Sequence, residues 1–217
     1  MSESESFINE VSEEVRRDRL FRIMRRYGWI AIALVVILVG GAAYNEWRKA
    51  AERNQAQAAG DAILNALDQP NASERLAALD QVTLKGDAET LVKLIAAAEA
   101  VQSEKRPEAI EKLKAVAADQ TAPRVFRDLA ALKLDMLEGG ARPADERRAV
   151  LRVLAEPGAP FRLVAEEQLA LIDLSEGDKE GAIKRLKAIM ADNDVTAGLR
   201  RRASQLIVAE GGSLDGQ

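Results

Sequence analysis

One uninterrupted apolar segment limits what this chain can fold into more than any other feature. Residues 27–44 read YGWIAIALVVILVGGAAY and contain no charged side chain. As a helix, a segment of this length rises about 27 Å, close to the thickness of the hydrocarbon core of a bilayer. The segment therefore predicts a transmembrane helix, which we place over residues 27–47.

Aromatic residues mark both ends of this segment. Tyr27 and Trp29 lie at its first end, and Tyr44 and Trp47 lie at or just beyond its second end. The chain has only two Trp and two Tyr, so all of them gather here. Because an amphipathic ring is most stable at the depth of the lipid headgroups, these four residues predict two membrane-interface belts.

Basic residues predict the orientation of the helix. Three of them follow the apolar segment closely, namely Arg48, Lys49 and Arg53. The positive-inside rule counts Lys and Arg near the span, so the larger set before it places the N-terminus in the cytoplasm. In a bacterium the C-terminal domain would then lie in the periplasm. The six arginines of the larger set are Arg16, Arg17, Arg19, Arg22, Arg25 and Arg26.

Two other interpretations of the apolar segment stay open. Gly41 and Ala43 are small enough for the cleavage site of a signal peptide, although the region before the segment is long and the helical pattern continues through residues 45–57. A buried helix of a soluble core is the other alternative, but few soluble helices are apolar all round over this length. We favour an uncleaved anchor.

The segment before the anchor, residues 1–26, has the pattern of a basic and amphipathic cytoplasmic helix. Its apolar residues Phe7, Ile8, Val11 and Val15 share one helical stripe. The alternative is a solvated tail that folds only against lipid or a partner.

Beyond the anchor, regularly spaced turn signals separate segments with helical apolar spacing. We expect about nine helices in antiparallel pairs over residues 48–210, then a disordered, glycine-rich tail over residues 211–217. Aromatic residues make up only 4% of the chain, which favours helices over sheets. In residues 122–138 the pattern places Val125, Phe126, Leu129, Leu132, Met136 and Leu137 inward, and Arg124, Arg127, Asp128 and Asp135 on the opposite face.

The helix pairs repeat along the chain. Ala122-Pro123 and Ala159-Pro160 both open a helix, and a shift by the distance between them places Leu132 on Leu169. The same shift again places Leu169 on Leu206. A period in the mid-thirties is typical of a helix–turn–helix solenoid. An irregular helical bundle with chance matches is the alternative.

Composition excludes several classes of function. The chain has no Cys and no His, which removes disulfides, thiolate metal sites and the commonest general base. A formal net charge of -4 gives no indication of nucleic-acid binding. Glu166 and Glu167 are adjacent carboxylates, but neighbours on a helix point in different directions. We therefore expect neither an enzyme nor a metal, cofactor or small-molecule substrate.

Residues 7–49, FINEVSEEVRRDRLFRIMRRYGWIAIALVVILVGGAAYNEWRK, followed by helical repeats, resemble the ancillary SecYEG translocon subunit family of bacterial inner-membrane proteins. The turn at residues 175–178 and the apolar positions after it are similar to part of a tetratricopeptide unit. The Trp and Tyr signature of that repeat has no match here. Those apolar positions are Ala182, Ile183, Leu186 and Ile189.

This resemblance implies an all-α fold in which a right-handed, tetratricopeptide-like solenoid of antiparallel helix pairs follows a single transmembrane helix. It also implies a single-pass inner-membrane location, association with the SecYEG translocon and with periplasmic chaperones, and assistance to newly translocated proteins.

A solenoid of helix pairs predicts a concave protein-binding face lined by the first helix of each pair. An ordinary solvated helix surface is the alternative for its candidate residues. The leading hypothesis is a non-catalytic protein-binding scaffold; a membrane-tethered envelope-assembly or structural scaffold unrelated to the translocon would share the same features. The candidate residues are Arg124, Arg127, Asp128, Asp135, Arg162, Glu166 and Asp173.

Overall fold

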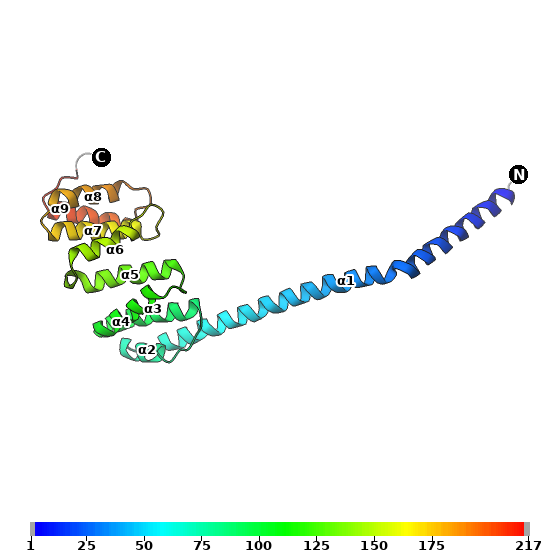
Figure 1. Cartoon of the computed structure of the whole chain (residues 1–217), viewed down its shortest axis with the longest axis horizontal. Coiled ribbons are helices and arrows are strands. Elements are labelled where there is room, and N and C mark those ends of the chain that lie inside the picture. Colours follow the sequence, from blue (N-terminus) through cyan, green and yellow to red (C-terminus); the bar gives the residue numbers. More distant parts are fainter. Residues whose placement is uncertain (1–2, 215–217) are drawn as a thin grey trace. The chain divides into compact units, whose positions relative to one another are not determined.

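The computed structural model describes residues 3–214, with side chains described for residues 24–30 and 33–214 (Figure 1). All secondary-structure elements in this part of the chain are α-helices or a 3₁₀ helix, and none is a strand. This confirms the all-α prediction. The elements are α1 (Glu3–Leu67), α2 (Ala72–Leu79), α3 (Asp87–Gln102), α4 (Arg106–Ala118), α5 (Arg124–Glu138), the 3₁₀ turn η1 (Gly139–Ala141), α6 (Ala144–Leu154), α7 (Arg162–Ser175), α8 (Lys179–Ala191) and α9 (Ala197–Ala209).

Helix α1 accounts for the difference between the nine helices expected after the anchor and the eight α-helices that follow α1 within residues 3–214. No proline or turn signal interrupts residues 45–67, so the apolar helix continues without a break and includes the residues of the first expected helix. Its polar stretch carries an ion pair one turn apart, Arg48 to Glu52 at 3.5 Å, on an exposed surface.

The chain divides into two compact units, Met1–Ala58 and Ala59–Gln217. The second unit includes the last turns of α1, whose Ile63 and Ala66 are buried. They pack in one cluster with Leu76 and Leu79 of α2 and Val92 of α3. Residues 48–58, which the sequence assigned to the repeat domain, lie in the first unit and form an exposed part of α1.

Within the second unit each helix packs against the next one along the chain, from α2 through α9. Helices α3, α5, α7 and α9 begin at residues 87, 124, 162 and 197, so the period in the mid-thirties is confirmed. The core clusters consist mainly of Leu, Ala, Val and Ile, as the low aromatic content predicts. Stacking of successive pairs therefore supplies a core that no pair could bury alone.

The same turn closes α3, α7 and α9. In each, a residue with positive φ follows the helix: Glu104 at 62°, Gly177 at 86° and Gly211 at 79°. This Schellman geometry satisfies carbonyl groups that a helix end leaves without partners. In each turn, the main-chain N–H of the residue after the positive-φ position donates to the carbonyl five residues earlier. These bonds join Lys105 N to Ala100 O (2.8 Å), Asp178 N to Asp173 O (2.9 Å) and Gly212 N to Ile207 O (2.8 Å).

These turns correct two sequence-based expectations. Aligning Gly177 with Gly211 places Leu169 on Ala203, and both are buried, so the expected match of Leu169 with Leu206 is wrong by about one turn. Gly211 and Gly212 also belong to the turn that ends α9. The last residues of the expected disordered tail, 215–217, lie outside the described residues.

Candidate functional site

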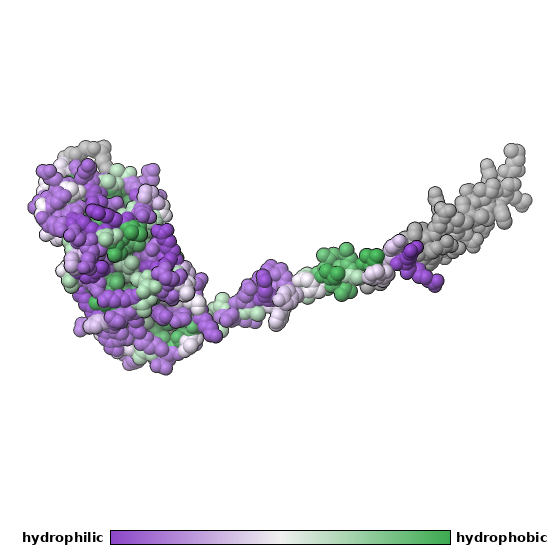
Figure 2. All heavy atoms as spheres, viewed as in Figure 1, coloured by the Kyte–Doolittle hydropathy of each residue, from purple (hydrophilic) through white to green (hydrophobic). Residues whose placement is uncertain are grey.

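The apolar part of α1 is exposed at almost all of the residues whose side chains the structure describes. The helix Met24–Leu67 contains a stretch of 18 residues with a mean hydropathy of 2.0, none of it buried, and is long and apolar enough to cross a membrane by length and composition. Figure 2 shows this apolar band along α1. A helix of a soluble core would bury at least one face, so the buried-helix alternative is wrong. A membrane anchor and a signal sequence both satisfy these observations.

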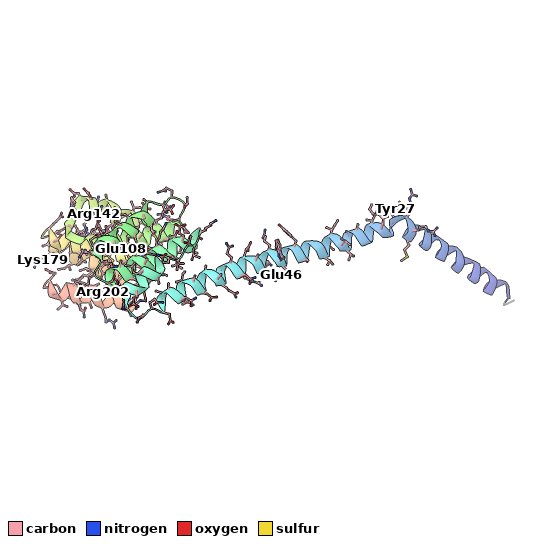
Figure 3. All side chains as sticks on the ribbon, turned by 90° about the horizontal axis from the view of Figure 1, so that it is seen from below. Tyr27, Glu46, Glu108, Arg142, Lys179 and Arg202 are labelled. Atoms are coloured by element: carbon pink, nitrogen blue, oxygen red, sulfur yellow. The ribbon has the colours of Figure 1, made fainter. Side chains whose placement is uncertain are left out.

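The predicted belt residues lie on the outside of α1. Tyr27 (labelled in Figure 3), Trp29, Tyr44 and Trp47 are all more than half exposed. The rings of Tyr44 and Trp47 lie 6.2 Å apart, so they form one aromatic cluster at the second end. Because more than half of each of these side chains is exposed, an interface between lipid and water is a suitable surrounding for them.

Of the six arginines predicted to set the topology, the structure describes the side chains of two. Arg25 and Arg26 are exposed, and the guanidinium of Arg26 lies 5.8 Å from the ring centre of Tyr27. This distance is typical of a cation–π contact and brings a positive charge to the first aromatic belt. The other four arginines of the set lie outside the described side chains: Arg16, Arg17, Arg19 and Arg22.

The seven residues predicted for a protein-binding face do not form one surface. Arg124 and Asp128 form an i,i+4 ion pair at 3.4 Å at the start of α5, in which Arg124 is exposed and Asp128 is half-buried. They line a hollow of about 370 Å³ together with residues 156–160 of the α6–α7 connection. Arg127 instead donates to Gln120 Oε1 at 2.7 Å, and its Nε is buried without a hydrogen-bond partner in the described part of the chain.

Arg162, Glu166 and Asp173 line a second groove, between α7 and α8, with a volume of about 500 Å³. Their charges already have partners inside the protein. Arg162 donates to Asp192 at 2.8 Å, and Arg185 bridges Glu166 and Asp173. The groove is therefore polar, but its fixed charges are largely balanced before any ligand arrives.

The predicted outward position of Asp135 is wrong. Asp135 is fully buried, whereas Val125 and Met136, which were expected inside, are exposed on α5. The buried carboxylate accepts two hydrogen bonds from Arg147 of α6, both at 2.9 Å. This pairing raises the pKa of Arg147, and it removes Asp135 from any open binding face.

Asp135 belongs to a series that the sequence analysis did not recognise. Glu99, Asp135 and Asp173 are buried acidic residues near the C-terminal ends of α3, α5 and α7. Each pairs with an arginine of a neighbouring second helix, and for Asp135 and Asp173 one partner lies twelve residues further along the chain. Glu99 pairs with Arg75, Asp135 pairs with Arg147, and Asp173 pairs with both Arg148 and Arg185.

A further bidentate pair links α7 to α9. Arg202 donates from Nε and Nη2 to both oxygens of Glu167, each at 2.7 Å, and this raises the pKa of Arg202. Glu166 pairs with Arg185 of α8 instead, so the two adjacent carboxylates do point in different directions. Within the described side chains, no three acidic residues come together as a metal site would require. These carboxylates connect helices.

Together, the helix pairs, the repeated turns and the ion pairs between successive helices define an α-helical repeat protein. Residues 24–157 match the family model of the tetratricopeptide repeat-like domain. The match covers more than half of the chain, so the chain belongs to this family. No curated protein and no solved structure matches it.

Proposed function

We propose that this chain is a membrane-anchored, non-catalytic scaffold that binds other proteins, and that it serves as an accessory subunit of the SecYEG translocon. In this proposal it assists periplasmic chaperones with newly translocated proteins. The observation that carries the proposal is the combination in one chain of a tetratricopeptide repeat-like domain with an unburied apolar helix. Such domains present surfaces for protein partners, and the helix keeps this surface at a membrane.

The link to the translocon rests on the resemblance of residues 7–49 to the ancillary subunit family. The proposed organisation is a cytoplasmic segment over residues 1–26, a single span over residues 27–47, a periplasmic repeat domain up to residue 210, and a short tail. The six arginines before the span support a cytoplasmic N-terminus through the positive-inside rule.

In-cell crosslinking followed by purification of the full chain tests the partner. We expect translocon subunits and periplasmic chaperones to be enriched above a control that retains only residues 1–58. The control has the first compact unit but lacks the second. Recovery of envelope-assembly proteins without any translocon subunit would favour the alternative scaffold. Equal recovery from both chains would remove the repeat domain from the proposed interaction.

Protease protection in inner-membrane vesicles, combined with the mass of the mature chain, tests the anchor. A full-length mass and cleavage of the repeat domain only after the periplasmic side is opened to protease are expected. A mature N-terminus near Ala43 would show that the apolar segment is a cleaved signal sequence.

A further inference from the structure

A groove of about 500 Å³ lies between α2, α3, α4 and the segment that joins α2 to α3. Its floor is apolar and buried, and it consists of Leu79, Val92 and Ala96. None of the seven residues predicted for a binding face lines it. The apolar floor favours insertion of an apolar side chain from a ligand.

One wall of this groove is formed by the segment 82–85, which belongs to neither a helix nor a strand among the described residues. In residues 82–85 the side chains of Val82 and Leu84 are half-buried and contact the core, while those of Thr83 and Lys85 are exposed. Such alternation is typical of an extended strand with one buried side. Val and Thr also favour that conformation.

The main chain of this segment is free to bind. Among the described residues, no main-chain group of Thr83, Leu84 or Lys85 forms a hydrogen bond with another part of the chain. A strand edge with free N–H and C=O groups is a template for pairing with another extended chain. The segment thus adds directional binding groups to the apolar floor beside it.

Among the side chains that line the groove, one negative charge is unbalanced. Lys93 pairs with Glu89 at 2.7 Å, and Lys112 pairs with Asp80 at 2.6 Å. Glu111 also lines the groove, is exposed, and forms no ion pair with the described side chains. A ligand that carries a positive charge next to its apolar part would complement this rim.

We propose that this groove binds an extended segment of an unfolded polypeptide whose apolar residues are flanked by a lysine or arginine. The ligand adds a strand along residues 83–85, inserts an apolar side chain over Leu79 and Val92, and places its cation near Glu111. This inference rests on the proposed protein-binding function and specifies the ligand and the groove.

Two other hollows among the described residues lack this combination. In the groove between α7 and α8 most charges are already paired inside the protein, and its walls are helices whose main-chain groups are bonded. A smaller hollow of about 230 Å³ between α3, α4 and α5 has exposed apolar residues, Val101 and Met136, but its walls are helices whose main-chain groups are already bonded. Only a side-chain contact is available there.

Fluorescence anisotropy with the full chain in lipid nanodiscs tests the groove, with empty nanodiscs as the blank. The probe is a short labelled peptide with alternating Val and Thr and a lysine on each flank. Ala115 is exposed on α4 and lines the groove, so Ala115→Trp should fill it and weaken binding at least about tenfold. Ala118→Trp is the matched control, because Ala118 is exposed on the same helix but does not line the groove; it should bind like the parent chain.

Two N-methylated versions of the peptide test strand pairing. Methyl groups on alternate amides block hydrogen bonds along one edge only. One version should lose about tenfold in affinity, since two or more hydrogen bonds are removed, and the other should bind like the parent peptide. If both methylated versions bound as tightly as the parent peptide, strand pairing would be overturned.

Glu111→Gln tests the charge. It should weaken binding of the lysine-flanked peptide about two- to fivefold, as expected for an exposed ion pair, and leave a serine-flanked peptide unchanged. If the lysine-flanked peptide bound Ala115→Trp as tightly as the parent chain, the groove would not be the binding site. If no peptide binds the parent chain, the docking inference fails, while the scaffold proposal is still decided by the crosslinking of partners in cells.

Discussion

At the scale of single residues, the buried carboxylates of α3, α5 and α7 are the most regular feature of the repeat domain. Glu99, Asp135 and Asp173 take the place of apolar residues near the ends of three consecutive first helices. A buried ion pair adds little stability over a well-packed apolar pair, but loss of one partner is costly. We interpret these ion pairs as a device that fixes which helices pair. Counted back from the residue with positive φ that follows each helix, Asp135, Asp173 and Ile207 occupy the same position, whereas α3 has the buried Ala100 there and Glu99 one residue earlier.

Arg147→Ala should strongly destabilise the repeat domain. It leaves the fully buried carboxylate of Asp135 without its two hydrogen bonds, at an expected cost of about 3–5 kcal/mol in the free energy of unfolding. Denaturant unfolding followed by circular dichroism measures this. Arg152→Ala, on the exposed side of the same helix, should change the free energy by less than about 0.5 kcal/mol. The double variant Asp135→Leu with Arg147→Met should recover most of the loss; no recovery would contradict our interpretation.

Asp192 should contribute to acid sensitivity. The main-chain N–H of Asp194 and the guanidinium of Arg162 lower the pKa of the Asp192 carboxyl. A lowered folded pKa gives stability that is present above the ordinary value of about 4 and is lost as the pH falls through the folded pKa. Melting temperatures of the parent chain and of Asp192→Asn should therefore differ most above about pH 5 and converge as the pH falls through the lowered pKa of Asp192. Asp61→Asn, at an exposed site on α1, is the control; a constant difference for Asp192→Asn across this range would contradict the assignment.

At the scale of elements, the turn after the first helix of a pair sets how the second helix begins. Gly177 occupies the positive-φ position between α7 and α8, whereas Glu104 occupies it between α3 and α4. A residue with a Cβ is strained in that conformation, and glycine is not. The two turns have matching main-chain hydrogen bonds, so the same positive-φ position can be compared with and without a Cβ.

Gly177→Ala should lower the free energy of unfolding by about 1 kcal/mol, because it introduces strain at a φ of 86°. Glu104→Gly should raise it by up to about 1 kcal/mol, because relief of strain outweighs the greater freedom of glycine in the unfolded chain. Opposite signs in thermal or denaturant unfolding are the diagnostic result. A loss of stability in Glu104→Gly would show that contacts of the glutamate side chain matter more than its backbone.

The sequence predicts most of these elements but not the pairing of their charges. Apolar spacing and turn signals locate the helices because both are local properties. Asp135 was assigned to the outer face because a carboxylate is buried only when a partner neutralises it, and Arg147 lies on another helix. The segment 82–85 is too short for its alternation to be recognised, and its free main chain appears only when the neighbouring helices are in place.

At the scale of the whole molecule, α1 belongs to both units of the chain. Its apolar part lies in the unit Met1–Ala58, while Ile63 and Ala66 complete a core cluster of the unit Ala59–Gln217. The apolar segment and the first residues of the repeat domain therefore belong to one continuous helix, and only the last turns of this helix contribute buried residues to the core of the domain.

This division predicts how the repeat domain responds to truncation. A fragment of residues 59–217 keeps Ile63 and Ala66 over Leu76 and Leu79, so it should fold and melt cooperatively without the anchor. A fragment of residues 71–217 loses both residues. It exposes apolar surface on α2 and α3, and removal of one buried isoleucine contact alone costs about 2–5 kcal/mol. Circular dichroism melts and binding of a hydrophobic dye distinguish the two, with the shorter fragment melting lower and binding more dye. Substitution of both Ile63 and Ala66 by serine within residues 59–217 is the matched control. If the lost contacts are responsible, this variant should reproduce the effect of the truncation. A melt like that of the parent fragment would assign the effect to the missing helical turns instead.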